Sequence, residues 1–102
     1  MSIEKRYLRN KASCKVTFRI PEEIGNSTEN AHVVGEFNEW STSANPMKRL
    51  KDGSFKATLD LESERAYQFR YLLEPNHWVS DPEADGQIPT PYGDGHNSVI
   101  LL

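Results

Sequence analysis

The sequence predicts an all-β protein whose strands pack as two layers. Short apolar runs with strand-like alternation recur along the chain at intervals of about eight to twelve residues, and there are about seven of them. The segments between them are rich in Gly, Pro, Asn and Asp, and helical periodicity is nearly absent. A length of 102 residues suits one domain with one core. Together these observations predict an immunoglobulin-like β-sandwich.

The first strand of the sandwich is expected at residues 14–20. Apolar side chains alternate there with polar ones, and Pro21 ends the run. The apolar positions are Cys14, Val16, Phe18 and Ile20. Residues 1–13 precede this strand as a basic arm, either one helical turn or irregular, so that the sandwich domain spans residues 14–102.

The second strand is expected at residues 31–37, after a loop at residues 22–30 that contains Gly, Asn, Ser and Thr. Gly35 permits a bulge or the close approach of a neighbouring strand, and Phe37 can turn back into the core. The strand then gives way to a polar turn that carries Trp40.

The remaining strands follow the same rules. They are expected at residues 47–50, 54–61, 67–73, 78–79 and 97–102. An Asp-Gly pair separates the first two of these, which is typical of a hairpin. Aromatic residues alternate along the third and give the sheet an aromatic face. Residues 80–96, rich in Pro, Gly and Asp, are expected to form a long loop.

Composition and charge exclude several classes of function. The net charge is −3, but the first 19 residues are basic and the last 29 contain no Lys or Arg. The basic segment is short and lacks interleaved aromatics, so we expect no nucleic-acid partner but a solvated arm, or one that docks on a partner or on the acidic end of the chain. No apolar run reaches membrane-spanning length, so no membrane contact is expected. The single cysteine, Cys14, agrees with a reducing compartment and a cytoplasmic location.

No catalytic residue, cofactor or metal site is predicted. The chain lacks the nucleophile-elbow, zinc-protease and phosphate-loop motifs. Residues 81–86 imitate the start of an EF-hand loop, but the twelfth position is Tyr92 where a bidentate Glu is required, so a solvated acidic turn is expected. The three histidines have no zinc-ligand spacing with one another or with Cys14.

The two tryptophans are the most informative residues for function. Trp40 and Trp78 each lie where a strand gives way to a turn, which favours positions near one end of the sandwich. Either ring can be a core residue, or it can stack on the apolar face of a pyranose. Arg70, on the outward face of the strand before Trp78, and Asn97, at the start of the last strand, are candidates for hydroxyl contacts. From position alone, both interpretations remain open.

Several segments occur in the order typical of one family. They are Val34-Gly35-Glu36-Phe37-Asn38-Glu39-Trp40, Leu59-Asp60-Leu61, Tyr67-Gln68-Phe69-Arg70-Tyr71-Leu72-Leu73, Trp78, Asp81-Pro82 and Asn97-Ser98-Val99. In this order they resemble the family-48 carbohydrate-binding module. This is the early-set immunoglobulin-like domain at the N-terminus of isoamylases and glycogen branching enzymes, and the glycogen-binding domain of the AMP-activated kinase β subunit. The resemblance covers roughly residues 14–102, and Gly-x-Phe-Asn-x-Trp is its most specific element.

The resemblance implies a site and a function. Trp40 and Trp78 fall on two sugar-stacking tryptophans, and Asn97 falls on a hydroxyl-binding asparagine. Arg70 stands where the glycogen binders have lysine, which keeps the charge but replaces an ammonium with a planar fork. Tyr92 is the candidate for a loop residue that wedges into the sugar chain.

The implied function is non-catalytic binding of α-1,4-linked glucan of the glycogen or starch type. The alternative is a protein-interaction domain that docks on a separate glucan-metabolising enzyme or kinase, with the basic arm in the interface. Exposure of the two indoles separates these alternatives, because a sugar platform has to face solvent.

Overall fold

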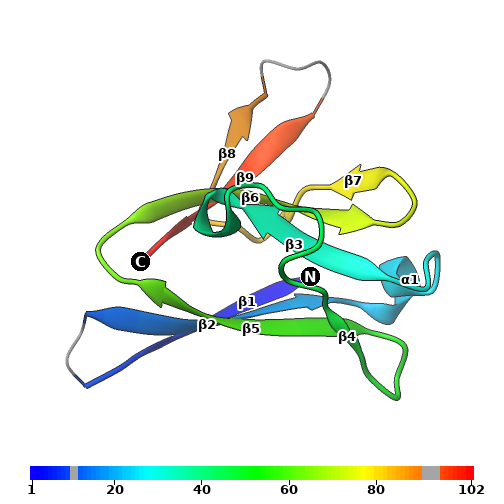
Figure 1. The fold of residues 1–102 in the computed structure, drawn as a ribbon, viewed down its shortest axis with the longest axis horizontal. Helices are drawn as coiled ribbons and strands as arrows, with labels where there is room; N and C mark the ends of the chain where they lie inside the picture. The colour runs from blue at the N-terminus through cyan, green and yellow to red at the C-terminus, as the bar shows by residue number, and fades with distance from the viewer. Residues whose placement is uncertain (10–11, 91–94) are drawn as a thin grey trace.

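The computed structural model describes residues 1–9, 12–90 and 95–102, and it confirms an all-β sandwich of two antiparallel sheets (Figure 1). The first sheet has the order β1 (Ser2–Tyr7), β2 (Ser13–Ile20), β5 (Phe55–Glu62), β4 (Lys48–Arg49). The second has the order β3 (Ala31–Gly35), β6 (Ala66–Leu73), β9 (His96–Leu101), β8 (Gly86–Pro89), and β7 (His77–Val79) also pairs with β6. The described residues therefore form nine strands, two more than the sequence pattern indicates.

The core lies between the sheets and follows the predicted alternation. Every second side chain of β2, from Cys14 to Ile20, is fully buried. The Phe18 ring centroid lies 5.1 Å from that of Phe69 and 6.3 Å from that of Tyr71, both in edge-to-face geometry. Because side chains alternate across a strand, the residues between these aromatics on β6 point away from the core.

Strand β6 organises the second sheet because both of its edges are paired. One edge pairs with β3 along Phe69–Leu73. The other pairs first with β9, along Ala66–Phe69, and then with β7, along Tyr71–Leu73. Arg70 lies where the second edge changes partner. The end of β7 and the start of β9, which carry Trp78 and Asn97, therefore meet beside it.

The N-terminal segment differs from the prediction of a helical turn or irregular arm. Residues 2–7 form strand β1, which pairs along the edge of β2. Ile3 packs against the core. The Lys5 ammonium lies 2.6 Å from Asp85 Oδ2 and donates to the Leu101 carbonyl at 3.0 Å. The basic segment thus docks on the acidic end of its own chain, through a contact between residues 80 positions apart.

Three other boundaries differ from the sequence prediction. Residues 80–96 contain strand β8 as well as loop, since residues 86–89 pair with β9. The second strand ends at Gly35 and is followed by a 3₁₀ turn, η1 (Glu36–Asn38). The loop at residues 22–30 opens with a single helical turn, α1 (Glu22–Gly25). None of the helices in the described part of the chain has the length and apolar character needed to cross a membrane.

Candidate functional site

Four of the five predicted site residues line one pocket on the outer face of the second sheet. The lining residues are Glu36, Trp40, Gln68, Arg70, Trp78, Thr90 and Asn97. The pocket has a volume of about 640 Å³, within the range of small-molecule sites. It lies on the open face of β6 and not at the end of the sandwich, because Gln68 and Arg70 alternate with core residues. Tyr92 lies outside the described residues. We call this site the tryptophan pocket.

Both indoles face solvent. The exposed fraction is 39% for Trp40 and 37% for Trp78, whereas the aromatic rings of the core on β6 are at most 4% exposed. Neither tryptophan belongs to the buried core cluster. The interpretation of the two tryptophans as core residues is therefore wrong.

Trp40 reaches the pocket through a tight turn that begins at Gly35. A β-carbon at Gly35 would lie 2.5 Å from the Gln68 carbonyl oxygen, so only glycine allows β3 to approach β6 this closely. This confirms the close approach that the sequence indicates. Glu39 and Trp40 then adopt left-handed φ angles of 56° and 59°, which are uncommon for residues other than glycine. The Trp40 N–H donates to the Gly35 carbonyl at 2.8 Å and closes the turn.

The Asn38 side chain holds this turn together. Its Oδ1 accepts from the Gly35 N–H at 3.1 Å. Its Nδ2 donates to the Val33 carbonyl at 3.1 Å and to Asn45 Oδ1 at 2.7 Å. One amide thus joins β3 to the loop that follows Trp40. The neighbouring Phe37 ring turns into the core, as predicted.

The opposite side of the pocket is built around Arg70. Its guanidinium carbon lies 5.9 Å from the centre of the Trp78 ring, a cation–π distance. A β-carbon at Gly95 would lie 3.0 Å from Arg70 Nη2, so the guanidinium lies close to the backbone there. Asn97 Nδ2 donates to Gln68 Oε1 at 3.1 Å. A planar cation, an amide pair and an indole ring therefore meet in one surface.

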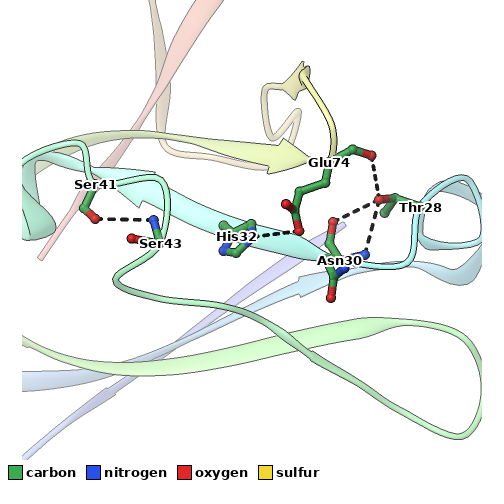
Figure 2. Close-up of polar contacts among 6 residues, drawn as sticks. All are labelled: Thr28, Asn30, His32, Ser41, Ser43 and Glu74. Atoms are coloured by element: carbon green, nitrogen blue, oxygen red, sulfur yellow. Dashed lines mark hydrogen bonds and ion pairs between the residues drawn. The ribbon is translucent and has the colours of Figure 1, made fainter.

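Two separate groups of polar contacts lie in the segments next to the tryptophan-bearing loops (Figure 2). His32 Nε2 lies 3.2 Å from Glu74 Oε2, which connects β3 to the turn before Trp78. The Thr28 hydroxyl lies 2.9 Å from the carbonyls of Asn30 and Glu74. On the other loop, Ser41 Oγ accepts from the Ser43 N–H at 3.3 Å. The first group joins the turn before Trp78 to β3 and to the loop before it, and the second stabilises the loop after Trp40 internally.

The chain matches the model of a known protein family. The model of carbohydrate-binding module 48, the isoamylase N-terminal domain, matches residues 24–84, which is more than half of the chain. The chain belongs to carbohydrate-binding module family 48. No curated protein matches the chain. The matched segment contains Trp40, Arg70 and Trp78, whereas Asn97 lies beyond its end.

The family-48 module has three pocket residues that sequence reasoning missed, Glu36, Gln68 and Thr90. Gln68 carried a usable signal, because it lies two positions before Arg70 and so shares its outward face. Glu36 precedes Phe37 in the motif, and its Oε1 accepts from the Gln68 N–H at 2.7 Å. Thr90 follows β8, a strand that the sequence pattern does not reveal.

The acidic segment at residues 81–86 is not simply a solvated turn, and this prediction is wrong at Asp81. Asp81 is fully buried, and its Oδ2 accepts from the Tyr71 hydroxyl at 2.8 Å. Its N–H donates to Ser98 Oγ at 2.7 Å. Burial of Tyr71, the charge of Asp81 and the hydrogen bond from the Tyr71 hydroxyl to Asp81 raise the pKa of Tyr71 well above its usual value. Within residues 1–9, 12–90 and 95–102, no three His, Cys, Asp or Glu residues gather as a metal site.

Proposed function

We propose that this family-48 module binds α-1,4-linked glucan of the glycogen or starch type in the tryptophan pocket, without transforming it. The observation that carries the proposal is the pair of exposed indoles bordering one pocket that also contains Arg70 and Asn97. A core role would bury both rings, and a sugar platform requires both to be accessible. The exposure thus favours sugar binding over a role confined to protein docking.

The chemistry of the pocket suits a glucose chain. The two indoles stack on the apolar C–H faces of glucose units. The Arg70 guanidinium, held between Trp78 and Gly95, donates to hydroxyls in a fixed plane. Asn97 uses Nδ2 for Gln68 and presents Oδ1 as an acceptor. Tyr92, outside the described residues, stays the predicted wedge residue.

The site is open, so affinity for one short chain should be weak. A branched polymer presents many copies of the same ligand, and rebinding raises the effective concentration. The proposed partner is therefore a polysaccharide or a long oligosaccharide. A separate glucan-metabolising enzyme is a second proposed partner, which the module would bring to the polymer.

A purely binding role is supported by the carboxylates of the pocket. Glycoside hydrolysis needs two carboxyl groups across the scissile bond. Among the described lining residues only Glu36 has one, and its Oε1 accepts from the Gln68 N–H. A cytoplasmic location is part of the same proposal. It is supported by the free, buried Cys14, which suits a reducing compartment.

The test is a titration with maltoheptaose followed by backbone amide shifts, because the chain's two tryptophans are both substituted in the variants. Trp40→Ala and Trp78→Ala are each expected to weaken binding about tenfold or more, as for aromatic hot spots, and the double variant is expected to abolish it. Tyr7→Ala is the matched control, because Tyr7 is an exposed aromatic on the other sheet. A wild-type protein that shows no saturable change up to millimolar ligand would refute the proposal. Equal affinity for a β-1,4-linked glucan of the same length would refute the proposed specificity for the α-1,4 linkage, although the pocket would still be a sugar-binding site.

A further inference from the structure

Strand β5 of the first sheet has an edge that is covered at one end only. On its other edge, β2 pairs with it from Phe55 to Glu62. On this edge, β4 pairs only with Phe55 and Lys56. Figure 1 shows β4 beside one end of the much longer β5. The edge of β5 from residue 57 onward has no neighbouring strand among the described residues.

The chain path explains why β4 is short. Pro46 forms a bridge with His32 of β3, and the Met47 N–H donates to the Ala31 carbonyl at 2.8 Å. The chain is therefore still attached to the second sheet at Met47 and reaches the first sheet only at Lys48. Because it crosses between the sheets at this point, it cannot follow β5 any further.

The free edge presents backbone groups that are ready to pair. The Leu50 N–H donates to the Ser54 carbonyl at 2.8 Å, so the backbone groups of Ser54 point away from β2. In an antiparallel ladder this direction repeats at every second residue. The backbone N–H and C=O groups of Thr58 and Asp60 therefore point outward, beyond the end of β4. Such an edge is a template for an added strand.

A pocket of about 450 Å³ lies along this edge. Its lining residues are Ala44, Asn45, Pro46, Lys48, Leu50, Lys56, Ala57, Thr58 and Leu59. Ala57 and Leu59 share the core side of β5 with Phe55 and Leu61, yet they are only half-buried, whereas those two are 1% and 7% exposed. The sandwich is thus open here, and an added strand would cover Ala57 and Leu59 with its own apolar side chains.

The charges along the edge set the direction of the added strand. Lys48 and Lys56 are paired across β4 and β5, and both are exposed at one end of the pocket. At the other end, the Asp60 carboxylate lies 3.5 Å from Lys15. A strand antiparallel to β5 would extend the line of β4 and point its C-terminal end at the two lysines. Acidic residues at that end complement them.

We propose that this edge binds an extended peptide segment of a partner protein by strand addition. The segment alternates small apolar and polar side chains and ends in acidic residues. It pairs with the backbone of Thr58 and Asp60, and its apolar side chains cover Ala57 and Leu59. The strand that would be extended, β5, belongs to the first sheet, whereas the tryptophan pocket lies on the outer face of the second.

The test uses the ¹⁵N-labelled protein and short synthetic peptides. The first peptide alternates valine and threonine and ends in two aspartates. The second is the same peptide with two lysines in place of the aspartates. The third is the first peptide with a proline at its centre. The first should shift the amide signals of Thr58 and Asp60 in a saturable way. The lysine peptide should bind about fivefold more weakly or worse, from two surface charge pairs. The proline peptide should not bind, because proline lacks the N–H that a ladder needs.

Two double variants localise the charges. Lys48→Glu with Lys56→Glu should weaken binding of the acidic peptide about fivefold, again from two surface pairs. Arg6→Glu with Arg9→Glu makes the same change in net charge on exposed residues away from the edge, and it should leave binding unchanged. Trp40→Ala should also leave it unchanged.

Three outcomes would overturn the proposal. The first is the absence of amide shifts at millimolar acidic peptide. The second is equal binding of the proline peptide, which would mean contact without strand addition. The third is a concentration-dependent shift of the same amides in the protein alone, which would make a second copy of the chain the occupant of the edge.

Discussion

Replacing Asn38 by alanine tests how the module holds Trp40 in place. The Asn38 side chain makes three hydrogen bonds, to Gly35, Val33 and Asn45. A hydrogen bond contributes about 1 kcal/mol net, so the sum is about 3 kcal/mol. The Asn38 side chain is half-buried, and water can replace part of its bonding. We therefore expect Asn38→Ala to lower the free energy of unfolding by about 2 kcal/mol.

Urea denaturation measures this change. With an m-value of about 1.5 kcal/mol/M for a small domain, the midpoint should fall by about 1.3 M. Glucan affinity should fall as well, because the turn that presents Trp40 would be formed only part of the time. If one molecule in ten keeps the competent turn, the apparent affinity for maltoheptaose falls about tenfold.

The matched control is Asn45→Ala, which removes only one of the three bonds, the one from Asn38 Nδ2 to Asn45 Oδ1. It should cost about 1 kcal/mol and affect binding less. If Asn38→Ala unfolds at the same urea concentration as Asn45→Ala and keeps the wild-type affinity, then Asn38 does not hold the turn and the reasoning fails.

Three further predictions concern stability. Gly35→Ala would place a β-carbon 2.5 Å from a carbonyl oxygen of β6, and it should destabilise by about 3 kcal/mol in thermal unfolding through overpacking. Tyr71→Phe removes the hydroxyl that donates to the buried Asp81, and it should lower the free energy of unfolding in urea by about 2 kcal/mol. Partial burial raises the pKa of Asp85, but hydrogen bonds from Lys5 and a backbone N–H, with the Lys5 charge, bring it below 3.8 overall. The carboxylate therefore stabilises the fold above about pH 3.8, and this contribution is lost as pH falls through the lowered pKa. Asp85→Asn should be less stable than the wild type at neutral pH by at most about 1 kcal/mol, and the difference should close on acidification.

Controls for the first two variants come from residues of the same type on other strands. Gly86→Ala is the control for Gly35, because a β-carbon there meets its nearest neighbour at 3.8 Å and should be tolerated. Tyr7→Phe is the control for Tyr71, since Tyr7 is half exposed. A Gly35→Ala protein as stable as the wild type, or an Asp85→Asn protein with an unchanged acid transition, would contradict the packing and charge arguments respectively.

The strands that the sequence predicted well are those in which one face is apolar. In β2 the alternation is complete, and in β6 it holds from Tyr67 to Tyr71, because core residues on one face meet polar residues on the other; Leu72 then breaks it. Strands β1 and β8 escaped detection since their signal is not local. In β1, Ile3 is followed at the next position on its face by Lys5, whose partner Asp85 lies 80 residues away. The β8 segment is short and ends in Pro89, so only its pairing with β9 makes it a strand.

The residues of the candidate site also divide into those that the sequence predicts and those that depend on contacts distant in the chain. Alternation places Arg70 on the outward face of its strand, but it does not say which loops approach that face. Their positions at strand ends made Trp78 and Asn97 candidates, the resemblance to a family implied sugar contacts for them, and the structure brings both to the pocket of Trp40. The alternation along the strand was enough to predict Gln68, because it shares the outward face with Arg70. The position of Thr90 in the pocket depends on the pairing of β8 and β9, which the sequence pattern does not reveal. The roles of these residues toward a sugar remain a proposal.

The floor of the tryptophan pocket is strand β6, which is paired on both edges, and the rim is formed by the segments that carry Trp40 and Trp78. The floor and the rim differ in local stability. Amides of a strand that is paired on both edges exchange with solvent only when the whole domain unfolds. The turn of Trp40 and the turn before Trp78 can open at a lower free energy, because they depend on a few polar bonds. Native-state hydrogen exchange should therefore show a slow floor at β6 and a faster rim, with ligand slowing the rim alone. A module built in this way can change the aromatic edge of its pocket while the strand beneath it stays the same.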